Sequence, residues 1–302
     1  MRSFVSFTIL LAACGVDDST LSSSYTGDPG VSPADDLTEG AEDTAAPAPV
    51  ITRCGSTTTP EQMAVIEASH KAALDAIEAQ GPTIAPVFAT VDVVVHMITN
   101  GNRGVESTQR INDQIAAFND AYAPVGIGFS LQTINTVNNS SWFANCAGWQ
   151  RDAMKSALHT GGKRTLNLYL CEPNDGTLGY SSFPWEYSGH PERDGVIIRH
   201  DTVPGGALRG FNEGDTAVHE VGHWLGLYHT FEGGCSNNGD LVADTAPERS
   251  PAYGCNRRRD TCNGGGLDPV TNFMDYSDDA CMNQFTSGQI SRMAAQWATY
   301  RQ

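Results

Sequence analysis

The spacing of apolar residues along the chain predicts both helices and strands. Helices are expected in four segments, and in the first two of them apolar residues recur at every third or fourth position. The helical segments are 60–79, 107–122, 151–159 and 287–300. Runs that are β-branched, or that alternate imperfectly between apolar and polar residues, predict strands. These runs are 87–98, 128–137, 165–171 and 195–199.

The order of these elements predicts the fold class. Strands and helices alternate along the chain, which favours an α/β (α+β) domain with helices packed on a twisted mixed sheet. Between 233 and 266 the chain is instead dense in Gly, Cys, Asp and Asn. We therefore expect an irregular lobe there, held by disulfides.

The amino-terminal region predicts export. Residues 4–13 form an almost wholly apolar run behind Arg2, too short for a bilayer span of about 20 residues but typical of the core of a secretory signal. The run ends Leu11-Ala12-Ala13-Cys14, which resembles a bacterial lipobox whose cysteine is lipid-modified. We expect 1–13 to be a lipoprotein-type signal peptide; an ordinary signal peptide with an incidental Cys14 is the alternative.

The next segment, 14–50, is rich in Ser, Thr, Asp, Ala, Gly and Pro and has almost no large apolar residue. Such a composition buries too little surface to offset the entropy lost on ordering, so a flexible linker is expected. The protein would then be secreted or lipid-anchored to a bacterial cell envelope, with a membrane contact only through the anchor.

Composition narrows the class of protein. An apolar content of 40 % in 302 residues suffices for one sizeable domain. The net charge of −17 argues against nucleic-acid binding, which needs clustered Lys and Arg. The 8 cysteines fit an oxidising compartment. Without Cys14 an odd number remains, so at least one thiol has no disulfide partner.

The most informative segment runs from His219 to His229. It reads His-Glu-Val-Gly-His-Trp-Leu-Gly-Leu-Tyr-His and matches H-E-x-x-H-x-x-G-x-x-H at every fixed position. On a helix His219 and His223 lie one turn apart on the same face, so both imidazoles can reach one ion. A continued helix would point His229 away, so we expect Gly226 to end the helix in a left-handed conformation.

This residue set predicts a catalytic zinc site rather than a structural one. Three neutral imidazoles leave a fourth zinc position open for water. Zinc lowers the pKa of its water from ~15.7 to about 7. Glu220, next to the first ligand, is then placed to take the water proton and to pass it to the leaving amine.

The motif resembles that of the metzincins, a clan of zinc endopeptidases. Their methionine turn beneath the metal is matched by Asn272-Phe273-Met274-Asp275-Tyr276. Within the clan the chain is most similar to the pappalysin-type (cytophagalysin) family over about 53–302. The shared segments are 219–234, Cys235, 239–245, 260–262, Phe285-Thr286 and Gln289. The resemblance implies a metzincin-type zincin domain with an active-site helix, a backing helix and an irregular disulfide-linked C-terminal subdomain.

The resemblance also implies roles for single residues. Met274 would form an apolar floor under the zinc histidines without binding the ion. Tyr276 would lie near the metal and hydrogen-bond the tetrahedral intermediate; a packed tyrosine with a satisfied hydroxyl is the alternative. The late cysteines would pair as Cys235–Cys262 and Cys255–Cys281, although sequence alone allows three pairings. Cys146 and Cys171 are expected as a further pair.

Two further sites follow from the same resemblance. Family members bind calcium near this loop, and Asp240, Asp244 and Thr245 offer hard oxygen ligands at a suitable spacing. Solvated or turn-capping side chains are the alternative. Cys54, in Arg53-Cys54-Gly55, is hypothesised to fill the fourth zinc position in a latent form. Segment 51–83 would then be a pro-segment and 84–302 the protease domain; a disulfide or an idle thiol is the alternative.

The sequence therefore predicts a zinc-dependent endopeptidase that acts on proteins or peptides. It is expected to be a monomer and not to bind nucleic acid. The alternative is a catalytically inactive surface lipoprotein that binds zinc and calcium. Some relatives cut beside basic residues through an acid in the pocket that takes the side chain after the cut. Asp278 and Asp279 are nearby candidates for that acid, but Ala280 stands where it is expected, so the sequence leaves a basic preference open.

Overall fold

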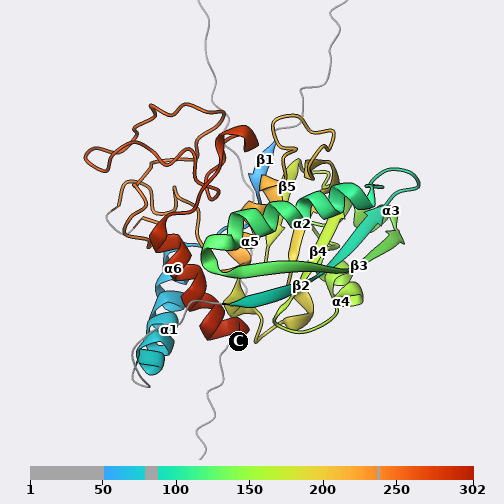
Figure 1. The fold of residues 1–302 in the computed structure, drawn as a ribbon, viewed down its shortest axis with the longest axis horizontal. Helices are drawn as coiled ribbons and strands as arrows, with labels where there is room; N and C mark the ends of the chain where they lie inside the picture. The colour runs from blue at the N-terminus through green and yellow to red at the C-terminus, as the bar shows by residue number, and fades with distance from the viewer. Residues whose placement is uncertain (1–50, 79–87, 237–238) are drawn as a thin grey trace, which may run out of the picture. The chain divides into compact units, whose positions relative to one another are not determined.

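The computed structural model describes residues 51–78, 88–236 and 239–302 (Figure 1). The expected signal peptide 1–13, Cys14, the linker 14–50 and the expected boundary near residue 83 lie outside these residues. No helix of the described part is long and apolar enough to cross a bilayer.

A six-stranded sheet forms the centre of the domain (Figure 1). Its strands are β1 (Thr52–Cys54), β2 (Ala89–Thr99), β3 (Ile127–Asn138), β4 (Thr165–Cys171), β5 (Thr177–Ser181) and β6 (Val196–Arg199). Their order is β1-β5-β6-β4-β2-β3. The neighbours β2, β3, β4 and β6 are parallel, β5 runs antiparallel to β6, and β1 pairs with β5 in parallel. The expected mixed sheet is confirmed.

Helices cover both faces of this sheet. Helices α2 (Thr108–Tyr122) and α5 (Asp215–Trp224) pack on one face, where Phe118 and Val221 meet Val93 in the main core. Helices α3 (Ser140–Asn145) and α4 (Arg151–Leu158) pack on the other, in a second cluster that includes Phe143 and Met154. Successive side chains of β2 point to opposite faces of the sheet. Most of them are buried, so both faces of this strand are covered.

The expected elements agree with the described ones to within two residues at nearly every end. Helix α1 covers Pro60–Glu78, and helix α6 covers Ser287–Gln296 before a π-helical turn, Trp297–Arg301, completes the segment expected as one helix. Three elements were missed, namely β1, α3 and β5. Strand β5 has only five residues with Gly179 at its centre, and glycine in a short run argues against a strand.

The chain after α5 has little regular structure and is held by disulfides. Cys235–Cys262 and Cys255–Cys281 crosslink this subdomain, and Cys146–Cys171 joins the end of α3 to the end of β4. These are the pairs that the sequence analysis named. Among the described cysteines Cys54 is the free one, and it is buried.

The carboxyl end of the chain is anchored beneath α5. The Arg301 guanidinium stacks on the Trp224 ring and forms an ion pair of 2.9 Å with Asp194. Asp194 also accepts a hydrogen bond from the Trp224 indole at 3.1 Å. All three side chains are buried, so one cluster holds the C-terminal residues, helix α5 and the loop before β6 together.

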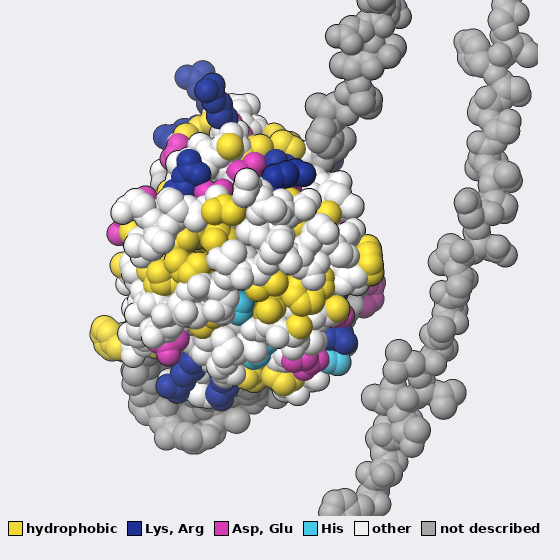
Figure 2. Space-filling view, turned by 90° about the vertical axis from the view of Figure 1, so that its right-hand side faces the viewer, with side chains coloured by type: hydrophobic (Ala, Val, Ile, Leu, Met, Phe, Trp, Pro, Cys, Tyr) yellow, Lys and Arg dark blue, Asp and Glu magenta, His cyan; other side chains and the backbone are white. Residues whose placement is uncertain are grey.

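The face of the molecule drawn in Figure 2 carries hydrophobic, charged and uncharged polar side chains. On the face drawn in Figure 2, basic and acidic side chains are scattered among uncharged ones, and hydrophobic side chains lie in several small groups between them. Hydrophobic groups of this size are common on soluble domains, so they single out no binding face by themselves.

Candidate active site

Helix α5 and the turn after it bring the three motif histidines together. His219 and His223 lie one turn apart on α5. Gly226 then adopts a φ of 92°, and the Leu227 amide donates a hydrogen bond to the Gly222 carbonyl at 3.0 Å. This reversal carries His229 back toward the other two rings, as the motif spacing predicts.

The distances between the histidines suit a single zinc ion. The Nε2 atom of His223 lies 3.2 Å from Nε2 of His219 and 3.1 Å from Nε2 of His229. Zn–N bonds of 2.0–2.1 Å in a tetrahedral site place ligand nitrogens about 3.3 Å apart. All three side chains are buried. The site is therefore small, nitrogen-rich and closed, which fits zinc.

The protonation of the rings fits the same ion. The Nδ1 atom of His219 donates to the Phe273 carbonyl at 2.7 Å, and that of His223 donates to the Leu227 carbonyl at 2.8 Å. These bonds place the proton on Nδ1 and leave the Nε2 lone pairs free. Burial lowers the pKa of both rings well below the usual value and that of His229 to about 3. Converging neutral lone pairs repel unless a cation lies between them.

Glu220 is a buried acid that lies next to the Cys54 thiol. Its side chain is 0 % exposed, and neither carboxylate oxygen has a hydrogen-bond partner among the described residues. Burial raises its pKa to about 8. An unpaired buried carboxylate is costly, so its presence points to a task in the reaction.

Gly179 of β5 is a functional position that the sequence analysis missed. A Cβ atom at this residue would overlap the Glu220 carboxylate. Glycine therefore lets the strand pass directly over the Glu220 carboxylate. A glycine inside an apparent loop gives no such signal in the sequence, because the contact joins residues 41 positions apart, 179 and 220.

The methionine turn lies under the histidines. Met274 is fully buried, and a Cβ at Gly222 would overlap its sulfur, so Gly222 allows the close packing of α5 on this turn. The Thr230 amide donates to the Met274 carbonyl at 3.3 Å and ties the turn to the segment after His229. No metal-binding contact is required of Met274.

Tyr276 reaches the metal position. Its hydroxyl donates to the Cys54 carbonyl at 3.1 Å and lies 3.3 Å from Nε2 of His229. Burial, followed by the nearby Cys54 and Glu220, raises the pKa of the phenol, so it stays protonated and able to donate a hydrogen bond.

Cys54 lies at the same point from the opposite side. Strand β1 pairs with β5 so that Cys54 is opposite Gly179. The Cys54 sulfur and one ring nitrogen of each of His219, His223 and His229 all lie within 4.8 Å of one another. The Ser56 amide donates to this sulfur at 3.2 Å. Three nitrogens and one sulfur make a complete tetrahedral set.

The residue before Cys54 forms a buried ion pair. Arg53 contacts Asp279 at 2.8 Å, and the two side chains are 2 % and 1 % exposed. Its guanidinium also donates to the Ser277 carbonyl. Asp279 is thus a buried acid beside the metal site, three residues after Tyr276.

The expected calcium residues have different surroundings. Asp240 is buried, and its Oδ2 atom and the Thr245 hydroxyl lack a partner among the described residues. Burial raises the pKa of Asp240 to about 7. Asp240 and Thr245 both line a cavity of about 250 Å³. Asp244 instead binds Thr286 at 2.7 Å and the Gly288 amide at 2.9 Å, so both its oxygens serve the start of α6.

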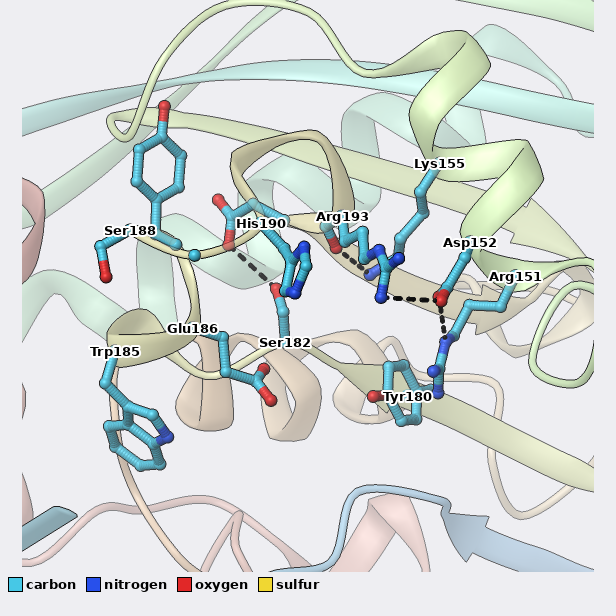
Figure 3. A pocket seen from close by; sticks show the side chains of 13 residues that line it. Arg151, Asp152, Lys155, Tyr180, Ser182, Trp185, Glu186, Ser188, His190 and Arg193 are labelled. Carbon is cyan, nitrogen blue, oxygen red and sulfur yellow. Dashed lines mark hydrogen bonds and ion pairs between the residues drawn. The ribbon is translucent and has the colours of Figure 1, made fainter. Parts of the chain in front are cut away.

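A separate cavity of about 330 Å³ lies beyond the end of β5 (Figure 3). Arg151 and Lys155 lie on one side of it and Trp185 on the other, with Glu186 between them. The Lys155 amine donates to two backbone carbonyls, and burial lowers its pKa to about 8. Its walls carry both signs of charge, and no motif histidine lines it.

Comparisons with known proteins agree with this geometry. Residues 207–298 match a peptidase family model described as "Pregnancy-associated plasma protein-A". The chain is 43 % identical to "Extracellular metalloprotease 1" of Coccidioides posadasii over 82 % of this chain and 90 % of that protein. It is 45 % identical to an "Extracellular metalloprotease" of Pyricularia oryzae over 82 % and 89 %.

Solved structures are similar as well. Promirolysin of Tannerella forsythia superposes with a TM-score of 0.67 at 28 % identity, covering 82 % of this chain and 94 % of that one. Mature mirolysin of the same organism in complex with a cleaved peptide gives 0.61 at 29 %, covering 72 % and 97 %. Together with the three converging histidines, these similarities show that the chain belongs to the pappalysin family of metzincin metalloendopeptidases.

Proposed function

We propose that the chain is a secreted zinc endopeptidase in which Glu220 activates water and Cys54 holds the enzyme latent. The observation that carries the proposal is the convergence of three Nε2 lone pairs beside the unpartnered Glu220 carboxylate. Hydrolysis of casein by the activated chain, and its loss when a zinc chelator is added, tests the activity. An inactive binding protein would hydrolyse nothing under either condition.

The residues divide the chemistry between them. His219, His223 and His229 would hold the ion, which when bound lowers the pKa of water and polarises a carbonyl. Glu220 accepts the water proton and delivers it to the leaving amine. The Tyr276 hydroxyl, released from the Cys54 carbonyl, donates a hydrogen bond to the oxygen of the attacked carbonyl.

The edge of β5 supports binding of an extended peptide. Strand β1 pairs with this edge, and the Gly55 amide donates to the Gly179 carbonyl at 2.9 Å. When residues 51–83 leave, the same backbone groups become free for a substrate strand. The pro-segment therefore occupies the groups that a substrate needs.

Latency rests on the fourth ligand. Replacing Cys54 with Ala in the full chain is expected to raise peptide hydrolysis before any proteolytic processing by more than about tenfold, about 1.4 kcal/mol. The reason is that the fourth zinc position would be open to water. A fluorogenic peptide assay on freshly purified protein measures this. Val65→Ala, a change at a 69 % exposed position of α1, should leave latency as it is; equal activation kinetics for both variants would rule out the switch.

The position of Arg53 suggests which substrate side chain is preferred directly after the cut bond. Its buried guanidinium fills a position beside the metal site and pairs with Asp279. Once the pro-segment leaves, Asp279 would lack a cation, and a substrate Arg or Lys is suited to replace it. Asp279, which directly precedes Ala280, would supply the acid that Ala280 lacks.

In the activated chain Asp279→Asn is therefore expected to reduce the preference for Arg over Leu after the cut by about tenfold or more. Mass spectrometry of cleaved peptide libraries measures the preference. Asp278→Asn serves as the matched control, and an unchanged preference in the Asp279 variant would exclude this pocket.

We also propose a structural calcium ion near Asp240 and Thr245, supported by their unpartnered buried oxygens. Asp244 is not a proposed ligand, because its carboxylate accepts hydrogen bonds from Thr286 and Gly288 at the start of α6. Calcium at 100 times its Kd should stabilise the fold by about 2.7 kcal/mol, seen as a higher melting temperature. Asp240→Asn should remove the increase, and the exposed Asp260→Asn should keep it. No increase in the unaltered chain would refute the site.

Relatives named extracellular metalloproteases support secretion of this chain. Lipid attachment at Cys14 is a finer proposal that rests on the apolar run before it. Labelling of cells with a fatty-acid analogue tests it, with Cys14→Ala as the control. Secretion without label would leave an ordinary signal peptide.

A further inference from the structure

Three aromatic side chains lie next to the motif histidines. The rings of Phe183 and Trp185 stack at 4.5 Å, and Tyr228 lies 5.9 Å from Phe183 and 5.8 Å from Trp185. The Phe183 ring also meets the edge of His223 at 5.3 Å. This group, Phe183, Trp185 and Tyr228, is called the aromatic cluster below.

The path of the pro-segment relates the cluster to the cleavage point. Arg53 reaches Asp279, Cys54 is opposite Gly179, and the Ser56 hydroxyl bonds the backbone of Ser181. Phe183 follows Ser181 by two residues. An extended chain on the β5 edge therefore runs from the Asp279 pocket, over the metal site, to the aromatic cluster.

The cluster is fixed by its own turn. The Phe183 amide donates to the Glu186 carboxylate at 2.7 Å, which closes the short helical turn Pro184–Glu186. Trp185 belongs to this turn. It lines the cavity of about 330 Å³ described above, on the side opposite Lys155 (Figure 3). The rings belong to the catalytic domain and would stay in place when the pro-segment leaves.

In this structure an apolar side chain of the pro-segment covers the cluster. Met63 of α1 is 7 % exposed and packs with Phe183 and Tyr228. Next to it Glu67 binds Arg292 and the Tyr228 hydroxyl, which holds α1 in place. A thioether against aromatic rings is a favourable contact beyond simple burial. Loss of α1 would expose these rings beside the cleft.

We propose that the aromatic cluster is a substrate subsite that takes one apolar, unbranched or aromatic side chain on the amino-terminal side of the cut bond. Met63 fills this subsite in the latent chain. The inference rests on the proposed function, which places the Asp279 pocket after the cut and hence the cluster before it. Met and Phe suit a ring-lined surface, because they bury much apolar area without a polar group to desolvate.

The test compares matched peptides on the chain after limited proteolysis has removed β1 and α1, which lie within 51–78. Each peptide has Arg after the cut bond and carries Met or Ala at the second, third or fourth position before it. At one of these positions kcat/KM is expected to be about tenfold higher for Met than for Ala. Phe183→Ala and Trp185→Ala should reduce this ratio to about twofold or less. Trp149→Ala removes a ring that is 74 % exposed and lies outside the aromatic cluster, so this variant should keep the tenfold ratio.

Because the ratio is measured within one protein preparation, it does not depend on how much of a variant is active. Phe183→Leu, which keeps an apolar side chain beside His223, replaces Phe183→Ala if that variant fails to fold. Absence of all cleavage would overturn the proposed function itself. Cleavage that still requires Arg after the bond, but with a Met-to-Ala ratio near one at every position, would overturn the aromatic subsite alone.

Discussion

Replacing Glu220 with Gln is expected to abolish peptide hydrolysis and to leave the metal bound. Glutamine keeps the size of the side chain but cannot accept the proton of the water, so kcat should fall by about 10²–10⁴-fold or more. The three imidazoles are untouched by this change, and zinc content should stay at the level of the unaltered chain. Hydrolysis of a fluorogenic peptide by the activated chain and metal analysis of the same sample give both values.

Glu192→Gln is the matched control for this change. Glu192 is 43 % exposed and pairs with Arg193 at the surface, so activity should stay within about twofold, since exposed ion pairs contribute little. A Glu220→Gln enzyme with activity near that of the control would remove Glu220 from the mechanism. Loss of zinc in the same variant would mean that it acts through the metal instead.

Replacing Asp194 with Ala is expected to lower the free energy of unfolding by about 3–5 kcal/mol. Arg301 and Asp194 are both 0 % exposed, so the change leaves a buried guanidinium without its counterion. It also removes the acceptor of the Trp224 indole at the end of the active-site helix. Urea unfolding of the full chain measures the loss.

The pH dependence of this ion pair has a defined sign. Burial alone would raise the pKa of Asp194, but the charge and hydrogen bonds of Arg301 outweigh it and lower the pKa below the usual value. The pair therefore stabilises the fold above the unfolded-state pKa of Asp, about 3.9. This contribution is lost as the pH falls through the lower folded-state pKa, and Asp194→Ala should lack that dependence.

Asp152→Ala tests whether burial is the cause. Asp152 binds Arg193 at 3.0 Å but is 39 % exposed, so its loss should cost less than about 1 kcal/mol. Equal destabilisation by the two changes would contradict the role assigned to the buried cluster.

The local features of the site could be predicted from sequence. The spacing of His219, Glu220 and His223 fixes them on one helix face, and Gly226 is needed where the helix must end. Helix and strand positions followed from apolar periodicity for the same reason, because each depends on residues only a few positions apart.

The missed features depend on residues far apart in the chain. Strand β5 is short and contains Gly179, whose role appears only when Glu220 is packed beneath it. The pairing of Asp279 with Arg53, and the packing of Met63 on Phe183 and Tyr228, join the start of the described chain to residues more than 100 positions later. No local pattern carries these contacts. Asp244 fits a ligand spacing equally well, and only the fold shows that α6 uses it.

Zinc analysis of the purified full chain, combined with X-ray absorption at the zinc edge, tests the central claim most directly. We expect one zinc per chain, with three nitrogens at about 2.0–2.1 Å and one sulfur at about 2.3 Å. The sulfur should disappear in Cys54→Ala while the three nitrogens remain. A chain that folds and carries no stoichiometric zinc, or a zinc without three histidine nitrogens, would contradict it.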